Sequence, residues 1–119
     1  SENLLSNIKL KVLLLKNEKI KESFFTSLNV EVFYGDITIL EDCKGFLEGH
    51  ENDVLIHTAG IIHPKSIKEF YDINLIGTVQ LAEIAIANKL RKMIILSSNS
   101  PLGCNPFLEH RFTESSPYN

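Results

Sequence analysis

Four short groups of small or hydrogen-bonding residues in this sequence could do chemistry, and each directly follows an apolar run. They are residues 16–18 (Lys-Asn-Glu), 35–37 (Gly-Asp-Ile), 58–60 (Thr-Ala-Gly) and 97–103, which begin with Ser97 and Ser98. In an open parallel sheet, ligands bind beyond the carboxyl ends of the strands. Residues of these types at successive strand ends would line a crevice that admits a flat, polar ligand.

The elements that must position these groups are four strands and three helices. Continuous apolar runs predict buried parallel strands at residues 11–15, 30–34, 54–57 and 93–96. Apolar residues at helical spacing predict helices between them, at residues 20–28, 39–47 and 66–90. Strands that alternate with helices require crossover connections and therefore a parallel sheet. The predicted fold class is α/β, with a doubly wound parallel sheet in one domain.

Composition and charge exclude several classes of function. The 119 residues are 44% hydrophobic and 23% charged, which is typical of one soluble globular unit. The formal charge is -3 and the basic residues form no stripe, so we expect no nucleic-acid partner. Polar residues interrupt the apolar stretch at 75–90, so we expect no membrane span. Cys43 and Cys104 imply neither a disulfide framework nor a zinc site, and a cytoplasmic location is expected.

The histidines do not have the spacing of metal ligands, and no metal site is predicted. His57 ends an apolar strand, where a core histidine with a satisfied hydrogen bond is expected rather than a ligand.

Four pieces of the sequence recur in the same order in one known family. They are Gly35-Asp36 after the second predicted strand, residues 53–60 (DVLIHTAG) at the third, residues 74–78 (NLIGT) in the long helix, and Ser97-Ser98 after the fourth. In these pieces the chain resembles the extended short-chain dehydrogenase/reductase superfamily, the NAD(P)-dependent sugar epimerases and dehydratases and their 3β-hydroxysteroid dehydrogenase relatives. The resemblance covers nearly the whole chain, and it implies a Rossmann fold that binds NAD or NADP.

The resemblance implies cofactor contacts at the second and third strand ends. Asp36 matches the aspartate whose carboxylate accepts a hydrogen bond from the adenine amino group, with the Ile37 backbone beside it. An Asx turn that caps the next helix is the alternative. Thr58, Ala59 and Gly60 match the turn where the backbone passes close to the ribose and diphosphate, which requires small side chains. A tight turn without a ligand would account for Gly60 almost as well.

The resemblance also implies two residues of the catalytic centre. Ser98 matches the serine or threonine that hydrogen-bonds the substrate hydroxyl or carbonyl during hydride transfer, and Ser97 beside it is assigned to the cofactor site. Asn74 matches an asparagine that bends its helix and holds the catalytic geometry. The alternatives are that the serines simply end a strand and that Asn74 is a solvated mid-helix residue. Pro101-Leu102 departs from the Val-Tyr that is frequent in the family, which leaves the substrate-facing wall undefined.

Lys16 follows the strand whose end meets the adenosine ribose in this family. An acidic residue there accepts hydrogen bonds from the free 2′-hydroxyl of NAD, whereas a basic residue can neutralise the additional phosphate of NADP. Lys16 therefore favours NADP, while Glu18 close by favours NAD, and a solvated surface lysine is the alternative.

Two features that turnover requires are missing from these residues. No two of the six glycines stand three apart, so the Gly-x-x-Gly step of the dinucleotide fingerprint is absent. No tyrosine is followed four residues later by a lysine, so the family's Tyr-x-x-x-Lys proton-transfer pair is absent too. We expect residues 1–119 to be a partial NAD(P)-binding Rossmann domain that lacks its first strand and glycine-rich loop, with a loop-rich tail at 101–119 and no C-terminal substrate domain.

Two functions from different classes follow. The first is a fragment of an NAD(P)-dependent oxidoreductase or epimerase that acts on a nucleotide sugar or a similar secondary alcohol by hydride transfer and is inactive as this chain alone. The alternative is a non-catalytic module that uses the Rossmann scaffold to sense a nucleotide or hold a partner. A missing first strand would expose a sheet edge and apolar surface, so we also expect self-association.

Overall fold

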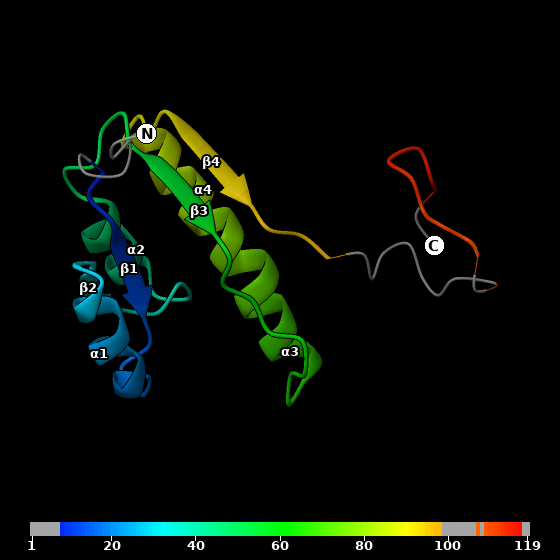
Figure 1. The fold of residues 1–119 in the computed structure, drawn as a ribbon, viewed down its shortest axis with the longest axis horizontal. Helices are drawn as coiled ribbons and strands as arrows, with labels where there is room; N and C mark the ends of the chain where they lie inside the picture. Colours follow the sequence, from blue (N-terminus) through cyan, green and yellow to red (C-terminus); the bar gives the residue numbers. More distant parts are fainter. Residues whose placement is uncertain (1–7, 99–106, 108, 118–119) are drawn as a thin grey trace.

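The computed structural model describes residues 8–98, 107 and 109–117, in which parallel strands alternate with helices (Figure 1). The strands are β1 (Lys11–Leu14), β2 (Glu31–Tyr34), β3 (Val54–His57) and β4 (Lys92–Ile95). The helices are α1 (Lys19–Ser27), α2 (Leu40–Leu47) and one continuous run of α3 (Ile67–Phe70), the π-helix η1 (Tyr71–Gly77) and α4 (Thr78–Ala87). Every predicted strand and helix is present, with small shifts at the ends.

The strands form two parallel pairs rather than one four-stranded sheet. β1 pairs with β2, with Val12 opposite Val32, and β3 pairs with β4, with Leu55 opposite Met93. In the doubly wound order 3-2-1-4-5, the first strand lies between the second and the fourth. The two pairs match the neighbours 3-2 and 4-5 of that order. The predicted α/β fold class with parallel strands is confirmed.

α1 and α2 cover opposite faces of the β1–β2 pair. Phe33 in β2 packs on Phe46 in α2, with ring centroids 5.8 Å apart. The hydroxyl of the next residue, Tyr34, donates a hydrogen bond to Glu22 in α1 at 2.6 Å. Because successive side chains of a strand point to opposite faces, the two helices lie on different sides of the pair.

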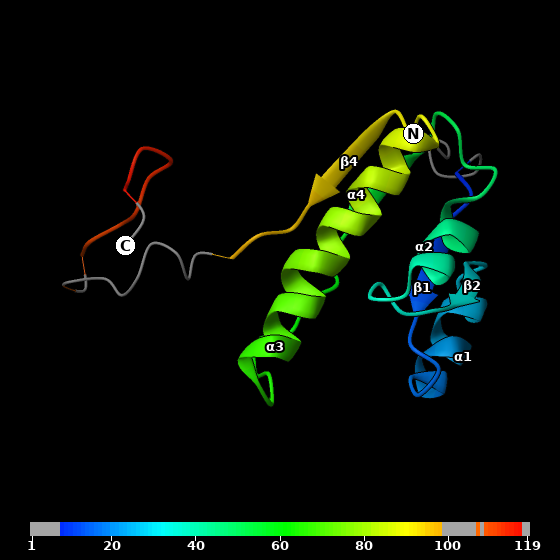
Figure 2. The same ribbon diagram turned by 180° about the vertical axis from the view of Figure 1, so that it is seen from behind.

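α2 and α4 form one layer that covers both strand pairs on the same face, as Figure 2 shows from the side of these helices. Leu13 and Phe33 from the first pair pack against the core under this layer, as does Met93 from the second. The buried residues of this core are Ile37, Cys43, Phe46, Leu47, Leu55, Leu81, Ile84 and Ala85. A single core on one side therefore holds the two pairs in one unit.

The opposite face of the β3–β4 pair is exposed and carries no helix among the described residues. Leu55 and His57 are buried on the α4 side. The alternate residue Ile56 is 64% exposed, and Ile94 opposite it is 45% exposed. The prediction that all four strands are buried is therefore wrong for this pair, which has a core on one face only.

The run Ile67–Ala87 is, by length and composition alone, long and apolar enough to cross a membrane. The sequence predicted no span because polar residues interrupt this stretch. Gln80 donates a hydrogen bond to the Ile37 carbonyl oxygen, and Thr78 Oγ1 lies 2.8 Å from His57 Nε2. In this structure the run is the helix that covers β3 and β4, and its polar residues anchor it to the strands and loops beneath.

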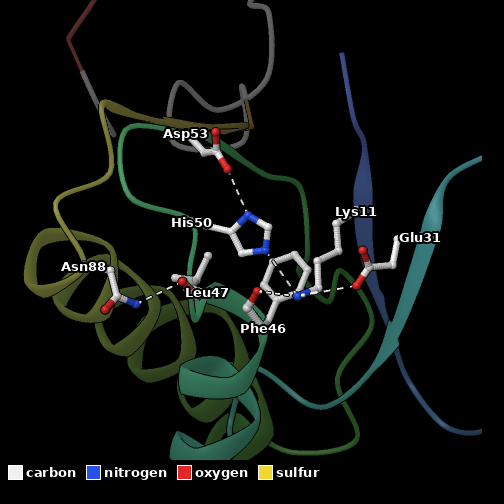
Figure 3. A network of polar contacts seen from close by, with 7 residues as sticks. All are labelled: Lys11, Glu31, Phe46, Leu47, His50, Asp53 and Asn88. Atoms are coloured by element: carbon white, nitrogen blue, oxygen red, sulfur yellow. Dashed lines mark hydrogen bonds and ion pairs between the residues drawn. The ribbon is translucent and has the colours of Figure 1, made fainter. Parts of the chain in front are cut away.

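A polar network links the two strand pairs at the amino ends of the strands (Figure 3). Lys11 at the start of β1 donates to the Phe46 carbonyl oxygen at 3.1 Å, and its Nζ lies 3.3 Å from His50 Nε2. The other ring nitrogen of His50 lies 2.9 Å from Asp53 Oδ2, directly before β3. A cation at the C-terminus of a helix complements the helix dipole. Lys11 thus closes the last turn of α2 and connects β1 to the chain that enters β3.

The predicted loop at 101–119 falls partly outside the described residues. Its described part, residue 107 and residues 109–117, contains turns and no helix or strand. Within it, the ring of His110 lies edge-on to Phe107 and Phe112, with centroids 5.4 and 4.9 Å apart.

Candidate functional site

The carboxyl end of β2 carries a firmly held turn at Asp36. Asp36 Oδ1 accepts hydrogen bonds from the Thr38 N–H and from Thr38 Oγ1, both at 2.8 Å, which is the Asx turn that the sequence offered as an alternative. The Asp36 N–H donates to Asp42 Oδ2 at 2.9 Å. Among the described residues, nothing donates to Asp36 Oδ2. Asp36 can therefore hold the turn through Oδ1 and still offer Oδ2 to a ligand.

Asp42 and Gly35 together make the turn possible. A Cβ at Gly35 would lie 2.9 Å from the Asp42 Cβ, so glycine is what lets the first turn of α2 approach this closely. Asp42 is therefore not simply a solvated helix residue, because its carboxylate accepts the Asp36 N–H.

Ile37 fixes the other side of the turn. Its side chain is buried in the core, and its carbonyl oxygen accepts hydrogen bonds from Gln80 Nε2 at 3.0 Å and from Cys43 Sγ at 3.3 Å. A Cβ at Gly77 would lie 3.0 Å from the Ile37 side chain, so this glycine lets the helix run pack directly on the turn. Sequence reasoning missed Gln80. The available signal was a polar residue on an otherwise apolar helix face.

The loop after β3 is held by Asn74. Thr58, Ala59 and Gly60 are all exposed, and the Ile61 that follows them is anchored. Asn74 Oδ1 accepts from the Ile61 N–H at 2.8 Å, and Asn74 Nδ2 donates to the Ile61 carbonyl oxygen at 2.8 Å. Asn74 is therefore not a solvated mid-helix residue. It lies in η1, and π-helical segments occur frequently at functional sites.

Gly60 provides the space for that anchor. A Cβ at this position would lie 3.3 Å from Asn74 Oδ1, closer than an ordinary van der Waals contact. A side chain here would therefore press on the Asn74 anchor, whether or not a ligand lies against the loop.

Ser97 and Ser98 follow β4 and are exposed. The arrows of β1, β3 and β4 in Figure 1 point the same way, so these serines, the Asp36 turn and the loop after β3 lie at one end of the α/β unit. Pro101 and Leu102, which depart from the family pattern, lie outside the described residues.

A hollow of about 560 Å³ lies beside the Asp36 turn, between it and the start of the helix run. Of the predicted site residues, Asp36 alone lines it. Its lining consists of Asp36, Thr38, Ser66, Lys68, Glu69, Asp72, Ile73 and Ile76. The structure thus places open space directly against the turn that holds the Asp36 carboxylate.

Lys16 and Glu18 follow β1 and differ in their surroundings. Glu18 Oε2 accepts from the Leu15 N–H at 3.4 Å, and Oε1 contacts the Lys21 ammonium. The hydrogen bond from Lys21 is the main reason that the pKa of Glu18 lies below its ordinary value. Lys16 is exposed and makes no comparable contact among the described residues. The Glu18 carboxylate, which would favour NAD, is therefore already bound to neighbouring residues of the same turn.

His57 is a core histidine, as predicted. It is buried, its Nε2 lies 2.8 Å from Thr78 Oγ1, and burial lowers its pKa, so the ring is neutral near pH 7. Among the described residues, no group of three or more His, Cys, Asp or Glu side chains could hold a metal ion.

The site combines two halves of a doubly wound sheet with a carboxylate in the turn after β2 and an anchored loop of small residues after β3. Together these features define a Rossmann-type unit of the extended short-chain dehydrogenase/reductase superfamily. The family profile described as the NAD dependent epimerase/dehydratase family matches residues 2–119. The chain belongs to this family.

Similar sequences include both unassigned proteins and enzymes. The protein y4nL of Sinorhizobium fredii, described as uncharacterized, is 42% identical over 112 residues, which cover 94% of this chain and 31% of that protein. The bifunctional UDP-glucose 4-epimerase and UDP-xylose 4-epimerase 1 of Pisum sativum is 28% identical over 95 residues, covering 72% of this chain and 26% of the enzyme. The chain thus spans about a third or less of the length of these relatives.

Similar solved structures confirm the fold. Pen from Bacillus thuringiensis has a TM-score of 0.65 at 25% identity, over 77% of this chain and 31% of that one. A uronate dehydrogenase variant from Agrobacterium tumefaciens, complexed with NAD, has a TM-score of 0.60 at 18% identity, over 83% of this chain and 44% of that one.

Proposed function

We propose that the protein containing this chain is an NAD(P)-dependent oxidoreductase or epimerase that acts on a nucleotide sugar or a similar secondary alcohol by hydride transfer. The observation that carries this proposal is the pair of anchored backbones at the strand ends. Asp42 and Gln80 hold the Asp36–Ile37 turn, and Asn74 holds the loop that ends at Ile61. Family membership and the epimerase relative support the reaction class.

The residues at the strand ends fit a dinucleotide. Asp36 keeps one carboxylate oxygen for the adenine amino group beside an open hollow. The exposed Thr58, Ala59 and Gly60 leave the backbone accessible to the ribose and diphosphate. When bound, the nicotinamide ring supplies the hydride acceptor or donor. Ser98 would hold the oxygen of the reacting alcohol or carbonyl through its hydroxyl.

Residues 1–119 alone are proposed to be inactive. They contain neither a Gly-x-x-Gly step to cradle the diphosphate nor a Tyr-x-x-x-Lys pair to move the substrate proton. We propose that this chain supplies one wall of the cofactor crevice and that the remaining groups belong to the longer protein.

Lys16 supports a preference for NADP over NAD. Its ammonium group is exposed after β1, whereas the Glu18 carboxylate is bound to Lys21 and to the Leu15 N–H. A positive charge at this strand end can neutralise the 2′-phosphate of NADP.

The proposed location is the cytoplasm, and the proposed partners are a small-molecule substrate and the nucleotide cofactor. The thiol of Cys43 is free and buried, which suits a reducing compartment.

Calorimetric titration of the full-length protein with NAD and NADP, followed by an absorbance assay for the reduced cofactor with UDP-sugars and simple secondary alcohols, tests the proposal. Micromolar binding and cofactor reduction, or epimerisation of a UDP-sugar, are expected. Binding without turnover of any alcohol would favour the non-catalytic module instead. The absence of binding to either nucleotide would contradict the enzyme and the nucleotide-sensing module, and would leave only a module that holds a partner.

A further inference from the structure

The His50 ring lies between a positive and a negative side chain at the amino ends of the strands (Figure 3). Its Nδ1 lies 2.9 Å from Asp53 Oδ2, and its Nε2 lies 3.3 Å from Lys11 Nζ. An ionised carboxylate can only accept a hydrogen bond, and an ammonium group can only donate one. Both contacts are therefore hydrogen bonds only when the ring is neutral, with its hydrogen on Nδ1 and the lone pair of Nε2 facing Lys11.

One added proton changes this arrangement on one side only. Protonated His50 carries a hydrogen on each ring nitrogen. Its Nδ1–H still donates to Asp53, and this contact then also joins opposite charges. On the other side, an Nε2–H and a positive ring face the Lys11 ammonium, so repulsion between like charges replaces the hydrogen bond. Histidine is the side chain whose charge changes between about pH 5 and 8.

Lys11 is the partner that can move. The backbone around His50 is held in a turn, because the His50 N–H donates to the Leu47 carbonyl oxygen and the Asp53 N–H donates to the His50 carbonyl oxygen. The Lys11 ammonium instead ends a flexible four-carbon stem. Its Nζ already lies 3.7 Å from Glu31 Oε1, on the side away from His50 (Figure 3). A second acceptor is thus within reach when the first is lost.

We infer that Lys11 and His50 form a pH-dependent latch between the two strand pairs. While His50 is neutral, Lys11 ties β1 to the chain that enters β3. Protonation of His50 releases Lys11 to Glu31 in β2, so the ammonium then pairs within the first strand pair alone. The layer of α2 and α4 still spans both pairs. The latch therefore loosens the amino ends of the strands and leaves the core closed.

The other charged groups near His50 do not replace Lys11. On the two loops beside His50, the charged side chains that remain are exposed, and they are Glu48, Glu51, Lys89 and Arg91. Glu51 and Lys89 line one hollow with His50, and their charged groups lie 3.9 Å apart, so they pair with each other. The Lys11 side chain is only 15% exposed, and water and salt screen its charge less.

NMR of the unchanged 119-residue chain, with ¹⁵N in the histidine rings and ¹³C in the lysines, tests the latch directly. At about pH 8 the His50 ring should carry its hydrogen on Nδ1 alone. As the pH is lowered to about 5, the Lys11 Cε shift should change with the same midpoint as the His50 ring nitrogens, and the Lys89 Cε shift should not. A hydrogen on Nε2 at the higher pH, or a Lys11 signal that does not follow the protonation of His50, would overturn the inference.

A double-mutant cycle measures the energetic link between the two side chains. Lys11→Met keeps most of the stem and removes the charge, and His50→Ala removes the ring. At about pH 7.5 the coupling should be about fivefold in the unfolding equilibrium constant, and at about pH 5.5 it should vanish or become unfavourable. Because each cycle compares variants at one pH, the titration of His57 cancels. The matched control is Lys89→Met with Glu51→Gln, whose coupling should be equal at the two pH values.

The exchange of partners gives a second cycle. For Lys11→Met with Glu31→Gln, the coupling should be about threefold larger at the lower pH than at the higher one. Equal coupling of Lys11 with His50 at both pH values, or a coupling of Lys11 with Glu31 that does not rise at the lower pH, would contradict the latch. If a variant fails to fold by circular dichroism, the NMR measurement on the unchanged chain decides alone.

Discussion

The side-chain amide of Asn74 forms two hydrogen bonds with the backbone of Ile61, one with its N–H and one with its carbonyl oxygen, each 2.8 Å long. These bonds join the π-helical segment to the loop after β3, which carries the proposed ribose and diphosphate contacts. An asparagine is well suited to this place because its amide carries a donor and an acceptor side by side.

Replacing Asn74 by leucine should destabilise the chain by about 1–3 kcal/mol, because the Ile61 N–H and carbonyl oxygen lose their partners. Asn74→Asp keeps the acceptor for the N–H but sets a carboxylate oxygen against the Ile61 carbonyl oxygen, so it should also destabilise the chain. Urea unfolding of the 119-residue chain measures both. Equal free energies of unfolding for the leucine variant and the unchanged chain would show that the two bonds carry no stability.

Gly35→Ala should separate α2 from the Asp36 turn, because the added Cβ would meet the Asp42 Cβ at 2.9 Å. Overpacking of this kind costs about 1–3 kcal/mol. Chemical shifts of the Asp36 and Thr38 amides should move as the Asp42 bond weakens. The comparison is Gly45→Ala, whose Cβ would meet only the ring of Phe33, at 3.1 Å. It should leave those two amide shifts nearly unchanged, and a matching shift would argue against the Asp42 contact.

The stability of the chain should fall as the pH drops below about 6.5, the ordinary pKa of histidine. Burial lowers the pKa of His57. Between its folded pKa and 6.5 the unfolded state binds more protons than the folded state, so the free energy of unfolding decreases with falling pH and levels off below the folded pKa. Urea unfolding at about pH 7.5 and about pH 5.5 measures this. His57→Gln, which cannot titrate, should flatten the slope, and an unchanged slope would assign it to other groups.

Lys16→Ala in the full-length protein should weaken binding of adenosine 2′,5′-bisphosphate about fivefold, the equivalent of roughly 1 kcal/mol, and should leave 5′-AMP binding unchanged. Lys21→Ala is the matched control, because Lys21 is paired with Glu18. The effect should shrink at high salt. Equal losses for the two nucleotides would place Lys16 away from the 2′-position.

The sequence was sufficient for the order and extent of the elements, because continuous apolar runs and helical spacing are local properties. Asp36 and Asn74 were singled out by the resemblance to the family, and both also stand out as polar side chains, one at a strand end and one on an apolar helix face. The roles of Asp42 and Gln80 were not predicted, because their partners are backbone groups at Asp36 and Ile37. Such contacts depend on how closely the helices approach the turn. The π-helix at Asn74 also has no local composition that marks it.

The separation into two strand pairs was not predicted from the sequence. Hydrophobic runs indicate that a strand is present, and they do not indicate which edge it pairs with. For the same reason, burial was overestimated at Ile56 and Ile94, whose apolar side chains lie on a face that the described helices do not cover.

The central claim, that the Asp36 turn receives the adenine end of a dinucleotide, is tested most directly by Asp36→Asn in the full-length protein. Asparagine can still accept the Thr38 hydrogen bonds and keep the turn, but it offers the adenine amino group an N–H₂ in place of an acceptor oxygen. Calorimetry should show affinity for NAD and NADP reduced about tenfold, with binding of nicotinamide mononucleotide, which has no adenine, unchanged. Unchanged affinity for both dinucleotides would contradict the account.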